Sequence, residues 1–140
     1  MKIITREIHL DTQGSPDLLD ITDSIAGLLG KTRLNQGNVT VFVIGSTAGI
    51  TSFEYEPGLI QDVQECYEKL IPSRRTYRHD AAWGDANGYS HLRASLTGPS
   101  LTIPFVNGKL LLGTWQQVVL AEFDNRPRRR RVVVQIIGEE

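Results

Sequence analysis

The polar stretch HDAAWGDANGYSH, residues 79–91, gathers side chains that could do chemistry. His79 and His91 lie twelve residues apart, with Asp80 and Asp85 between them. Two imidazoles and a carboxylate suit zinc or a similar divalent ion and leave a coordination position for water or substrate. The same groups could instead hydrogen-bond a phosphate or transfer a proton near neutral pH. The spacing matches no established metal motif, so a loop histidine and a helix-capping histidine are an equal alternative.

The elements around this stretch decide whether the two histidines can meet. If NGYSHLRASL is a helix, His91 lies one turn inside it, and His79 precedes the small-residue loop AAWGDANG, which can fold back. We therefore expect the two rings to face each other across a shared pocket, with residues 45–48 as another wall. Rings more than about 10 Å apart could not share one metal ion or one phosphate.

Two further segments carry candidate binding residues. The turn GSTAG, residues 45–49, offers Ser46 and Thr47 with two glycines, as in a backbone cradle for an anion, although a plain tight turn explains it equally well. Glu54 and Glu56 follow two residues apart, so one strand face could present both to Mg²⁺, or they could reflect surface alternation. Gly113-Thr114-Trp115 is either a bulge that re-aims a side chain toward a cleft or a turn filled by a core Trp.

Charge and length exclude several classes of protein. The chain has 140 residues, 40% of them hydrophobic and 22% charged, with a net charge of -1. These values predict a single compact domain, residues 1–140, with no general attraction to nucleic acid. The apolar runs fall short of the roughly 20 residues that a membrane-spanning helix needs, and no signal-peptide pattern is present, so we expect no membrane partner and a cytoplasmic location.

The run of arginines from Arg126 to Arg131 and the lone Cys66 have less specific interpretations. The arginine run lacks interleaved aromatic residues, so a solvated turn, or a cluster that neutralises acidic residues of a neighbouring subunit, is favoured over a nucleic-acid patch. Helical spacing places Cys66 with Leu59, Val63 and Leu70, which predicts a core thiol.

Hydrophobic periodicity predicts the elements. MKIITREIHL alternates as a strand, and SPDLLDITDSIAGLLG reads as a helix from an N-cap at Ser15 to Gly30. GNVTVFVIGST and GITSFEYEPG read as strands that could pair, and LIQDVQECYEKLI as a helix ended by Pro72. Asn107-Gly108 between apolar runs predicts a hairpin, followed by strands in WQQVVLAEFD and RRVVVQIIG.

This order of elements does not alternate strand and helix as a parallel fold would, so it predicts an α+β fold with a mostly antiparallel β-sheet packed with two or three helices. Alternation within the strands also predicts which side chains form the core of the sheet. The predicted core residues are Val41, Val43, Leu101, Ile103, Leu111, Val118, Leu120, Val132 and Val134.

Taken in order, the segments GSTAGITSFEYEPGL, YRHD, GYSHLRASLTGPSLTIPF, GKLLLGTWQQVVLAEFD and RRRRVVVQIIGE resemble the YjbQ-like family, small proteins described as secondary thiamine-phosphate synthases. The resemblance runs over nearly the whole chain, and its most distinctive parts are SHLRASLTGPSLTIP and LGTWQ. It implies a compact α+β protein that forms homotrimers. The family has a His-Thr-Ser-Ala element where this chain has Gly45-Ser46-Thr47-Ala48, so one of three imidazoles is missing and two remain.

The resemblance implies a reaction that joins a pyrimidine-methyl diphosphate to a thiazole phosphate with loss of diphosphate. It also implies a divalent metal, Mg or Zn. We expect catalytic roles for His79, His91 and Asp85, and metal ligation by His79, His91 and Glu54. We expect substrate contacts from Ser46, Thr47, Arg93, Trp115 and Gln116. Arg93 or Arg78 would hold phosphate, and Trp83, Tyr89 or Trp115 would stack on a ring.

The sequence leaves a second hypothesis open. With two imidazoles and no evident nucleophile, the chain could be a non-catalytic module that binds a metal ion or a small anion. In either case the expected partners are a small phosphorylated molecule and two further copies of the chain, and neither nucleic acid nor membrane.

Overall fold

The computed structural model describes all residues from Met1 to Glu140. It is an α+β structure with eight strands and four helices, which confirms the predicted fold class. In chain order the elements are β1 (Lys2–Thr12), β2 (Asp17–Asp20), α1 (Thr22–Gly30), β3 (Gln36–Ile44), β4 (Ala48–Glu54), α2 (Pro57–Leu70), α3 (Arg78–Trp83), α4 (Gly88–Thr97), β5 (Ser100–Val106), β6 (Lys109–Leu110), β7 (Gln116–Glu122) and β8 (Arg128–Glu139). None of the helices combines the length and the apolar character needed to span a bilayer.

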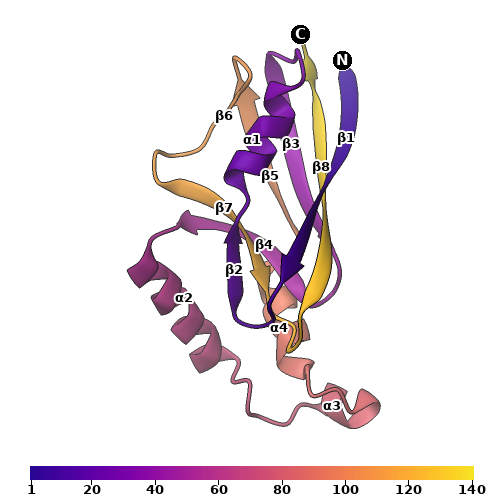
Figure 1. Ribbon diagram of the computed structural model, residues 1–140, viewed down its shortest axis with the longest axis vertical. Helices are drawn as coiled ribbons and strands as arrows, with labels where there is room; N and C mark the ends of the chain where they lie inside the picture. Colours follow the sequence, from indigo (N-terminus) through magenta and orange to yellow (C-terminus); the bar gives the residue numbers. More distant parts are fainter.

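The strands form two sheets in which every pairing is antiparallel (Figure 1). One sheet has the order β1-β8-β3-β5-β6 and the other the order β2-β7-β4. The last strand, β8, lies between the first strand, β1, and β3, and its pairing with β1 runs from Lys2 opposite Gly138 to Thr12 opposite Arg128. Helices α2, α3 and α4 gather around one end of the molecule, and the two chain termini lie at the other (Figure 1).

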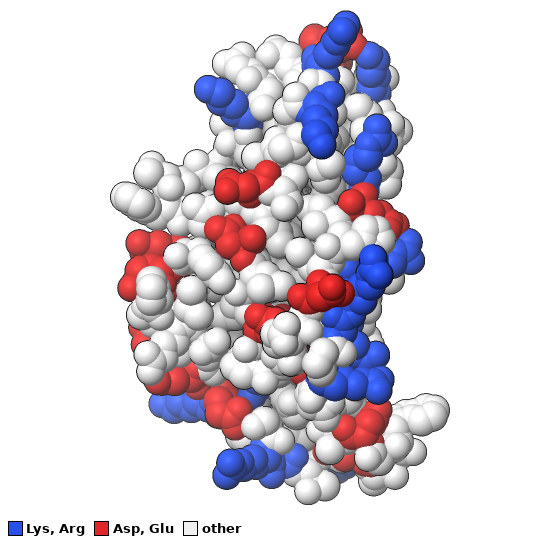
Figure 2. Space-filling model, in the orientation of Figure 1, with Lys and Arg blue, Asp and Glu red and all other residues white.

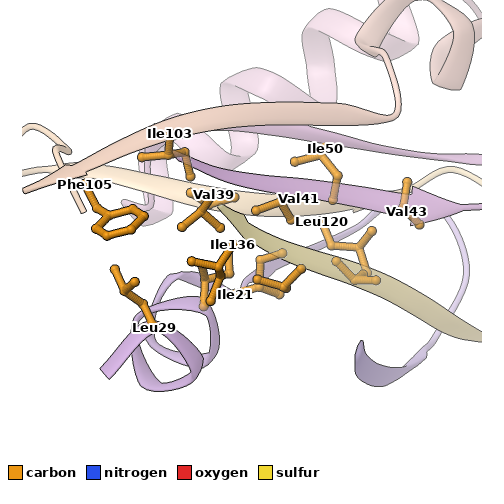
Figure 3. Packing of buried hydrophobic residues seen from close by; sticks show 14 of the residues in the cluster. Ile21, Leu29, Val39, Val41, Val43, Ile50, Ile103, Phe105, Leu120 and Ile136 are labelled. Atoms are coloured by element: carbon orange, nitrogen blue, oxygen red, sulfur yellow. The ribbon is translucent and has the colours of Figure 1, made fainter. Parts of the chain in front are cut away.

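The main core lies between the two sheets and helix α1 (Figure 3). Period-two alternation turns Val41 of β3 and Val134 of β8 inward as direct cross-strand partners, and both are fully buried. Ile25 of α1 and Leu120 of β7 close the core from the other side. Seven of the nine predicted core residues are buried. Leu101 is only partly buried, and Leu111 is 57% exposed because it follows the short strand β6 instead of lying within a strand.

Two neighbouring isoleucines of β8 provide a test of this alternation. Ile136 is fully buried and Ile137 is 36% exposed. We expect Ile136→Val to lower the free energy of unfolding by about 0.5–1.5 kcal/mol, because it removes one buried methylene. Ile137→Val should change it by less than about 0.5 kcal/mol. Denaturant titration of both variants measures the difference, and equal effects would show that the faces of β8 are wrongly assigned.

The first helix begins later than predicted. Residues Asp17–Asp20 form strand β2, in which Leu18 lies opposite Ala121 of β7, and α1 starts at Thr22. The backbone amide and hydroxyl of Thr22 both donate to Asp20 Oδ1, which fixes the turn between the strand and the helix. Leu18 belongs to a second, smaller core cluster, so the helix-like spacing of the apolar residues arose from two different elements.

The predicted pairing of residues 37–47 with residues 49–58 is wrong. Strand β3 lies between β8 and β5 in one sheet, whereas β4 pairs with β7 in the other. The chain therefore passes from one sheet to the other at residues 45–47. Beyond β4, Glu56 accepts hydrogen bonds from the Gly58 and Leu59 amides as the N-cap of α2, so Glu54 and Glu56 do not share a strand face.

The prediction of a core thiol is also wrong. Helix α2 has no fully buried residue, and Cys66 is exposed. It borders an open apolar hollow of about 310 Å³ between α2, α4 and β4, which Val63 and Leu70 also line.

The predicted hairpin is confirmed, because Val106 pairs with Lys109 around Asn107 and Gly108, whose φ values are 54° and 68°.

Candidate functional site

The two histidines of the polar stretch face each other. His79 lies near the start of α3 and His91 in the first turn of α4, and their ring centroids are 4.3 Å apart at an interplanar angle of 42°. The expected meeting of the rings is therefore confirmed. The Nδ1 atom of His79 is buried and has no hydrogen-bond partner in the chain. With their centres 4.3 Å apart the two rings contact each other, so a ligand would bind beside the pair and not between the rings.

Asp80 fixes the positions of the two helices, α3 and α4, that carry the rings. Its Oδ2 accepts the Tyr77 amide at 2.9 Å and its Oδ1 accepts the Gly88 amide at 2.8 Å, so it ties the start of α3 to the start of α4. These two hydrogen bonds lower the pKa of Asp80, and the charge of His79 adds to the effect. A Cβ at Gly88 would lie 2.6 Å from Tyr77 Cβ, so only glycine allows this approach.

The environment of His91 favours its neutral form. Burial lowers the pKa of His91 most strongly, and the neighbouring His79 lowers it further. The charges of Asp124 and Asp85 oppose these effects without overcoming them. At neutral pH His91 therefore carries one ring proton, so it can accept a hydrogen bond or a proton at one nitrogen and donate at the other.

Two hollows adjoin the histidine pair. The first, called here the basic hollow, has a volume of about 590 Å³. Two arginines and both imidazoles contribute to its wall, and no carboxylate does. The basic hollow is lined by Arg75, Thr76, Tyr77, Arg78, His79, Gly88, His91 and Leu92. The guanidinium of Arg75 lies 5.4 Å from the ring centre of Tyr77, which supports it by a cation–π contact.

The second hollow, called here the small-residue hollow, has a volume of about 470 Å³. It lies where the chain crosses between the sheets and is lined by Gly45, Ser46, Ala48, His91, Leu92, Ala94, Ser95 and Pro99. Gly45 has a φ of +145°, and a Cβ there would lie 2.8 Å from Arg130 Nη1. The backbone at this position is therefore one that glycine adopts readily and other residues do not.

A buried set of charged side chains lies beneath the small-residue hollow. Glu122 at the end of β7 accepts two hydrogen bonds from Arg130, at 2.6 and 2.5 Å, and Arg130 also donates to Thr47. Asp124 accepts from Thr47 and from Asn87, the residue just before α4, so it links the 45–48 turn to the helix that carries His91. Asp124 and Asn87 were not predicted as site residues. In the sequence, Glu122 and Asp124 are two residues apart, and so are Arg128 and Arg130. This matched spacing of acidic and basic residues was the signal that could have indicated the pairs.

The charge of Asp124 should make stability depend on pH. Burial acts to raise its pKa, but hydrogen bonds from Arg128, Thr47 and the Asn125 amide outweigh burial, and the pKa lies below its ordinary value of 3.8. The stabilisation is therefore present above pH 3.8 and is lost as the pH falls through the lowered pKa. We expect Asp124→Asn to cost about 1–3 kcal/mol at pH 7, because a charge-assisted hydrogen-bond set is weakened.

That cost should shrink as the pH falls below 3.8 toward the lowered pKa, because the unfolded chain then takes up a proton that the folded carboxyl still lacks. Urea titrations of both proteins between pH 7 and pH 2.5 measure the difference, and the exposed Asp62 of α2 supplies the control Asp62→Asn. A difference that is constant over this range would show that the charge of Asp124 does not contribute.

The arginine run is not the solvated turn that the sequence favoured. Strand β8 begins at Arg128, so most of the run lies in a strand. Arg128 pairs with Asp124, Arg130 with Glu122 and Arg131 with Glu7, all within the chain. Figure 2 shows Lys and Arg along the edge formed by β1 and β8 with acidic residues between them, and not a single basic patch.

Several predicted site residues lie elsewhere or are already engaged. Arg93 is 3% exposed, donates to Glu68 and to the Ile71 carbonyl, and lies 4.9 Å from the ring centre of Tyr89. Its guanidinium thus joins α4 to the end of α2. Thr47 is buried against Arg130, whereas Ser46 is exposed at the small-residue hollow.

Asp85 lies in the loop between α3 and α4, and its carbonyl accepts a hydrogen bond from Asn125 Nδ2. Its charge raises the pKa of His91, although burial and His79 together outweigh it. Asp85 therefore acts on His91 through its charge, and no hydrogen bond joins its carboxylate to either ring.

The remaining predicted residues gather at the far end of strands β4 and β7. Ala48 lies opposite Glu122, and six residues further along each strand Glu54 lies opposite Gln116, about 20 Å away at the rise of a β-strand. Trp115, which precedes Gln116, is 71% exposed. The structure therefore does not bring Glu54, Trp115 or Gln116 to the histidines. No group of three or more His, Cys, Asp or Glu side chains is placed to hold a metal ion.

The sequence has relatives over nearly its full length. The family described as UPF0047 protein YjbQ-like matches residues 6–139. A UPF0047 protein from Methanothermobacter thermautotrophicus is 39% identical over 139 residues, which cover 99% of this chain and 95% of the relative. A UPF0047 protein from Archaeoglobus fulgidus is 38% identical over 131 residues, covering 94% of this chain and 99% of the relative.

Solved structures share the fold. The crystal structure of a YbjQ-like protein of unknown function from Sulfolobus solfataricus matches with a TM-score of 0.94 at 33% identity and covers 99% of both chains. An uncharacterized YjbQ/UPF0047 protein from Clostridium acetobutylicum matches with a TM-score of 0.87 at 36% identity, covering 94% of this chain and 99% of the other.

Proposed function

Because this chain belongs to the UPF0047 family of YjbQ-like proteins, we propose that it is a transferase acting on small phosphorylated heterocycles at the His79–His91 pair. The reaction proposed is that of a secondary thiamine-phosphate synthase, which the resemblance in sequence implies. The observation that supports a phosphorylated substrate best is the facing pair of imidazoles at the wall of a hollow that holds two arginines.

The arginines are free to meet a ligand. Neither Arg75 nor Arg78 takes part in an ion pair of this chain, whereas Arg93, Arg128, Arg130 and Arg131 all do. A guanidinium presents several donors that match the oxygens of a phosphate, often two at a time. The basic hollow is thus suited to a group that carries more than one negative charge.

The proposed reaction needs no covalent bond between the protein and a substrate. The ring nitrogen of the thiazole attacks the methylene carbon of the pyrimidine, a C–N bond forms, and the C–O bond to the diphosphate breaks. The electron pair of that bond leaves with the diphosphate, whose growing charge must be neutralised. Arg75 and Arg78 would neutralise it, and an imidazole N–H of His79 or His91 would donate to the departing oxygen.

A divalent metal fits this site only in part. His79 and His91 supply two nitrogen ligands, and the nearest carboxylate, Asp80, has both oxygens engaged with backbone amides. Mg²⁺ prefers oxygen ligands and is often held by substrate phosphates together with one or two carboxylates. The side chains of this chain alone therefore do not form a complete site for Mg²⁺ or Zn²⁺, and the steps given above need none.

Reconstitution tests the proposal. Purified protein is incubated with the pyrimidine-methyl diphosphate and the thiazole phosphate, and thiamine phosphate and released diphosphate are measured. We expect the two products in equal amounts and growth of a thiamine-requiring strain that expresses the protein. No growth, together with no product from the purified protein, would contradict the proposal.

A second candidate is a non-catalytic module that binds a metal ion or a small anion. Gly45 favours it, because an imidazole that the resemblance places there is missing and the remaining pair lacks a nucleophile beside it. Metal analysis after mild purification separates these ideas, since less than about a tenth of an equivalent of metal would count against a metal-binding module. Phosphate or diphosphate binding without turnover would support an anion-binding module.

We propose further that the protein is a homotrimer. The outward face of the β1-β8-β3-β5-β6 sheet carries exposed apolar side chains between the inward valines and isoleucines, among them Ile3, Phe42, Ile44, Val106 and Ile137. An exposed apolar sheet face of this kind is typical of a surface that another chain covers. Light scattering at micromolar concentration should give three times the monomer mass of 15.6 kDa, and a monomer mass would contradict the proposal.

A further inference from the structure

The basic hollow and the small-residue hollow are neighbours with opposite character. His91 and Leu92 line both of them, so these two side chains stand between the hollows. On one side lie two arginines and a second imidazole. On the other side His91 is the only residue with an ionisable side chain, and the remaining lining comes from glycine, alanine, serine, leucine and proline.

We propose that the two hollows are subsites for the two parts of one ligand, with the phosphate or diphosphate in the basic hollow and an uncharged ring in the small-residue hollow. This assignment rests on the proposed function for the ring, and it adds which residues select each part. A ligand that spans both hollows must pass His91, so the bond between its ring-bearing carbon and its phosphate oxygen would lie beside that imidazole.

The composition of the small-residue hollow supports an uncharged occupant. A phosphate placed there would meet no guanidinium or ammonium on the wall, so its negative charge would lose hydration without gaining a permanently charged partner. A neutral ring instead gains contact with Leu92, Ala48 and Pro99, and the exposed Ser46 and Ser95 can hydrogen-bond its edges. Volumes of about 470 and 590 Å³ each lie within the range of small-molecule sites.

Gly45 contributes to the size of the small-residue hollow. Residues other than glycine rarely adopt its φ of +145°, so the wall of the hollow has no side chain at this point. A Cβ at this position would lie 2.8 Å from Arg130 Nη1, so a side chain there would have to displace the Arg130 guanidinium. Because Gly45 carries no side chain, the wall of the small-residue hollow has no polar side chain at this point.

Calorimetry with three probes tests the assignment in the absence of any reaction partner. The probes are inorganic diphosphate, the pyrimidine-methyl diphosphate and the uncharged pyrimidine alcohol. We expect the wild-type protein to bind the pyrimidine-methyl diphosphate about tenfold more tightly than diphosphate, because the ring fills the second hollow. The uncharged alcohol should bind most weakly, because it lacks the charged group.

Two variants separate the hollows. Ser95 is exposed on α4, and Ser95→Phe should fill the small-residue hollow. This variant should lose the tenfold preference for the pyrimidine-methyl diphosphate while its Kd for diphosphate stays within about twofold. Arg78→Gln should weaken both charged probes about tenfold or more. The matched controls are Ser24→Phe on the exposed side of α1 and Arg74→Gln, whose residue does not line the hollow.

The outcomes distinguish this inference from the proposed function. If Ser95→Phe weakens both charged probes equally, or neither of them, the division into two subsites is wrong. It is equally wrong if Arg78→Gln leaves diphosphate binding unchanged. If the graded binding is found but reconstitution gives no thiamine phosphate, the subsites stand and the synthase proposal falls. If product forms and Ser95→Phe does not alter KM for the pyrimidine substrate, the synthase proposal stands and the subsites fall.

Discussion

Replacement of Arg130 by methionine should lower the free energy of unfolding by about 3–5 kcal/mol. Arg130 is 6% exposed and Glu122 is fully buried, and two hydrogen bonds join them. Removal of the guanidinium leaves the Glu122 carboxylate in the interior without a charged partner, which costs far more than the net value of the pair. Thr47 loses a donor in the same variant, so the 45–48 turn should loosen as well.

The neighbouring Arg129 provides the matched control, because it is exposed and belongs to no ion pair of the chain. Arg129→Met should change stability by less than about 0.5 kcal/mol. The double variant Arg130→Met with Glu122→Leu should recover part of the loss, since it removes the unpaired charge together with its partner. Guanidinium chloride unfolding of all four proteins measures these values. Equal losses in Arg130→Met and Arg129→Met would mean that the pair is not buried.

Replacement of His91 by alanine should abolish ligand binding or lower turnover by about 10²–10⁴-fold while leaving the protein folded. His91 lines both hollows and lies against His79, so every ligand position described above meets its ring. Alanine is the residue that helices accept best, and His91 is only half-buried in α4. The thermal midpoint should therefore stay close to that of the wild-type protein.

The matched control is His9→Ala. His9 lies on the outer face of β1, where its Nε2 is 3.2 Å from Glu7, and it takes no part in either hollow. Diphosphate titration by calorimetry and the reconstituted assay would both be run on the two variants. If His91→Ala keeps wild-type affinity and turnover, the facing histidines are a packing feature and the proposed site lies elsewhere.

The sequence was most informative where a side chain's position depends on its own strand. Alternation of apolar and polar residues gave the inward faces of β3 and β8, and Asn107-Gly108 gave the hairpin, because both signals are local. The meeting of His79 and His91 could also be anticipated, since a short loop of small residues joins their elements. These features need no information about distant parts of the chain.

Prediction failed where partners come from distant segments. Residues 17–20 have helix-like spacing but form a strand because β7, about a hundred residues later, offers an edge to pair with. Cys66 has the spacing of a core residue, yet no element covers its side of α2. Arg93 was predicted to bind phosphate, but its guanidinium donates hydrogen bonds to Glu68 and to the Ile71 carbonyl. The role of Asp124 depends on three segments at once and has no local signature.

The position of β8 between β1 and β3 has a consequence for how the protein is made in the cell. Translation produces β1 first and β8 last, yet β1 pairs with no other strand, and β3 gains a second neighbour beside β5 only when β8 is in place. The larger sheet therefore cannot close until β8 has left the ribosome. Until then β3 offers an unpaired edge on the side away from β5, and chains that end before β8 should be captured by chaperones or aggregate.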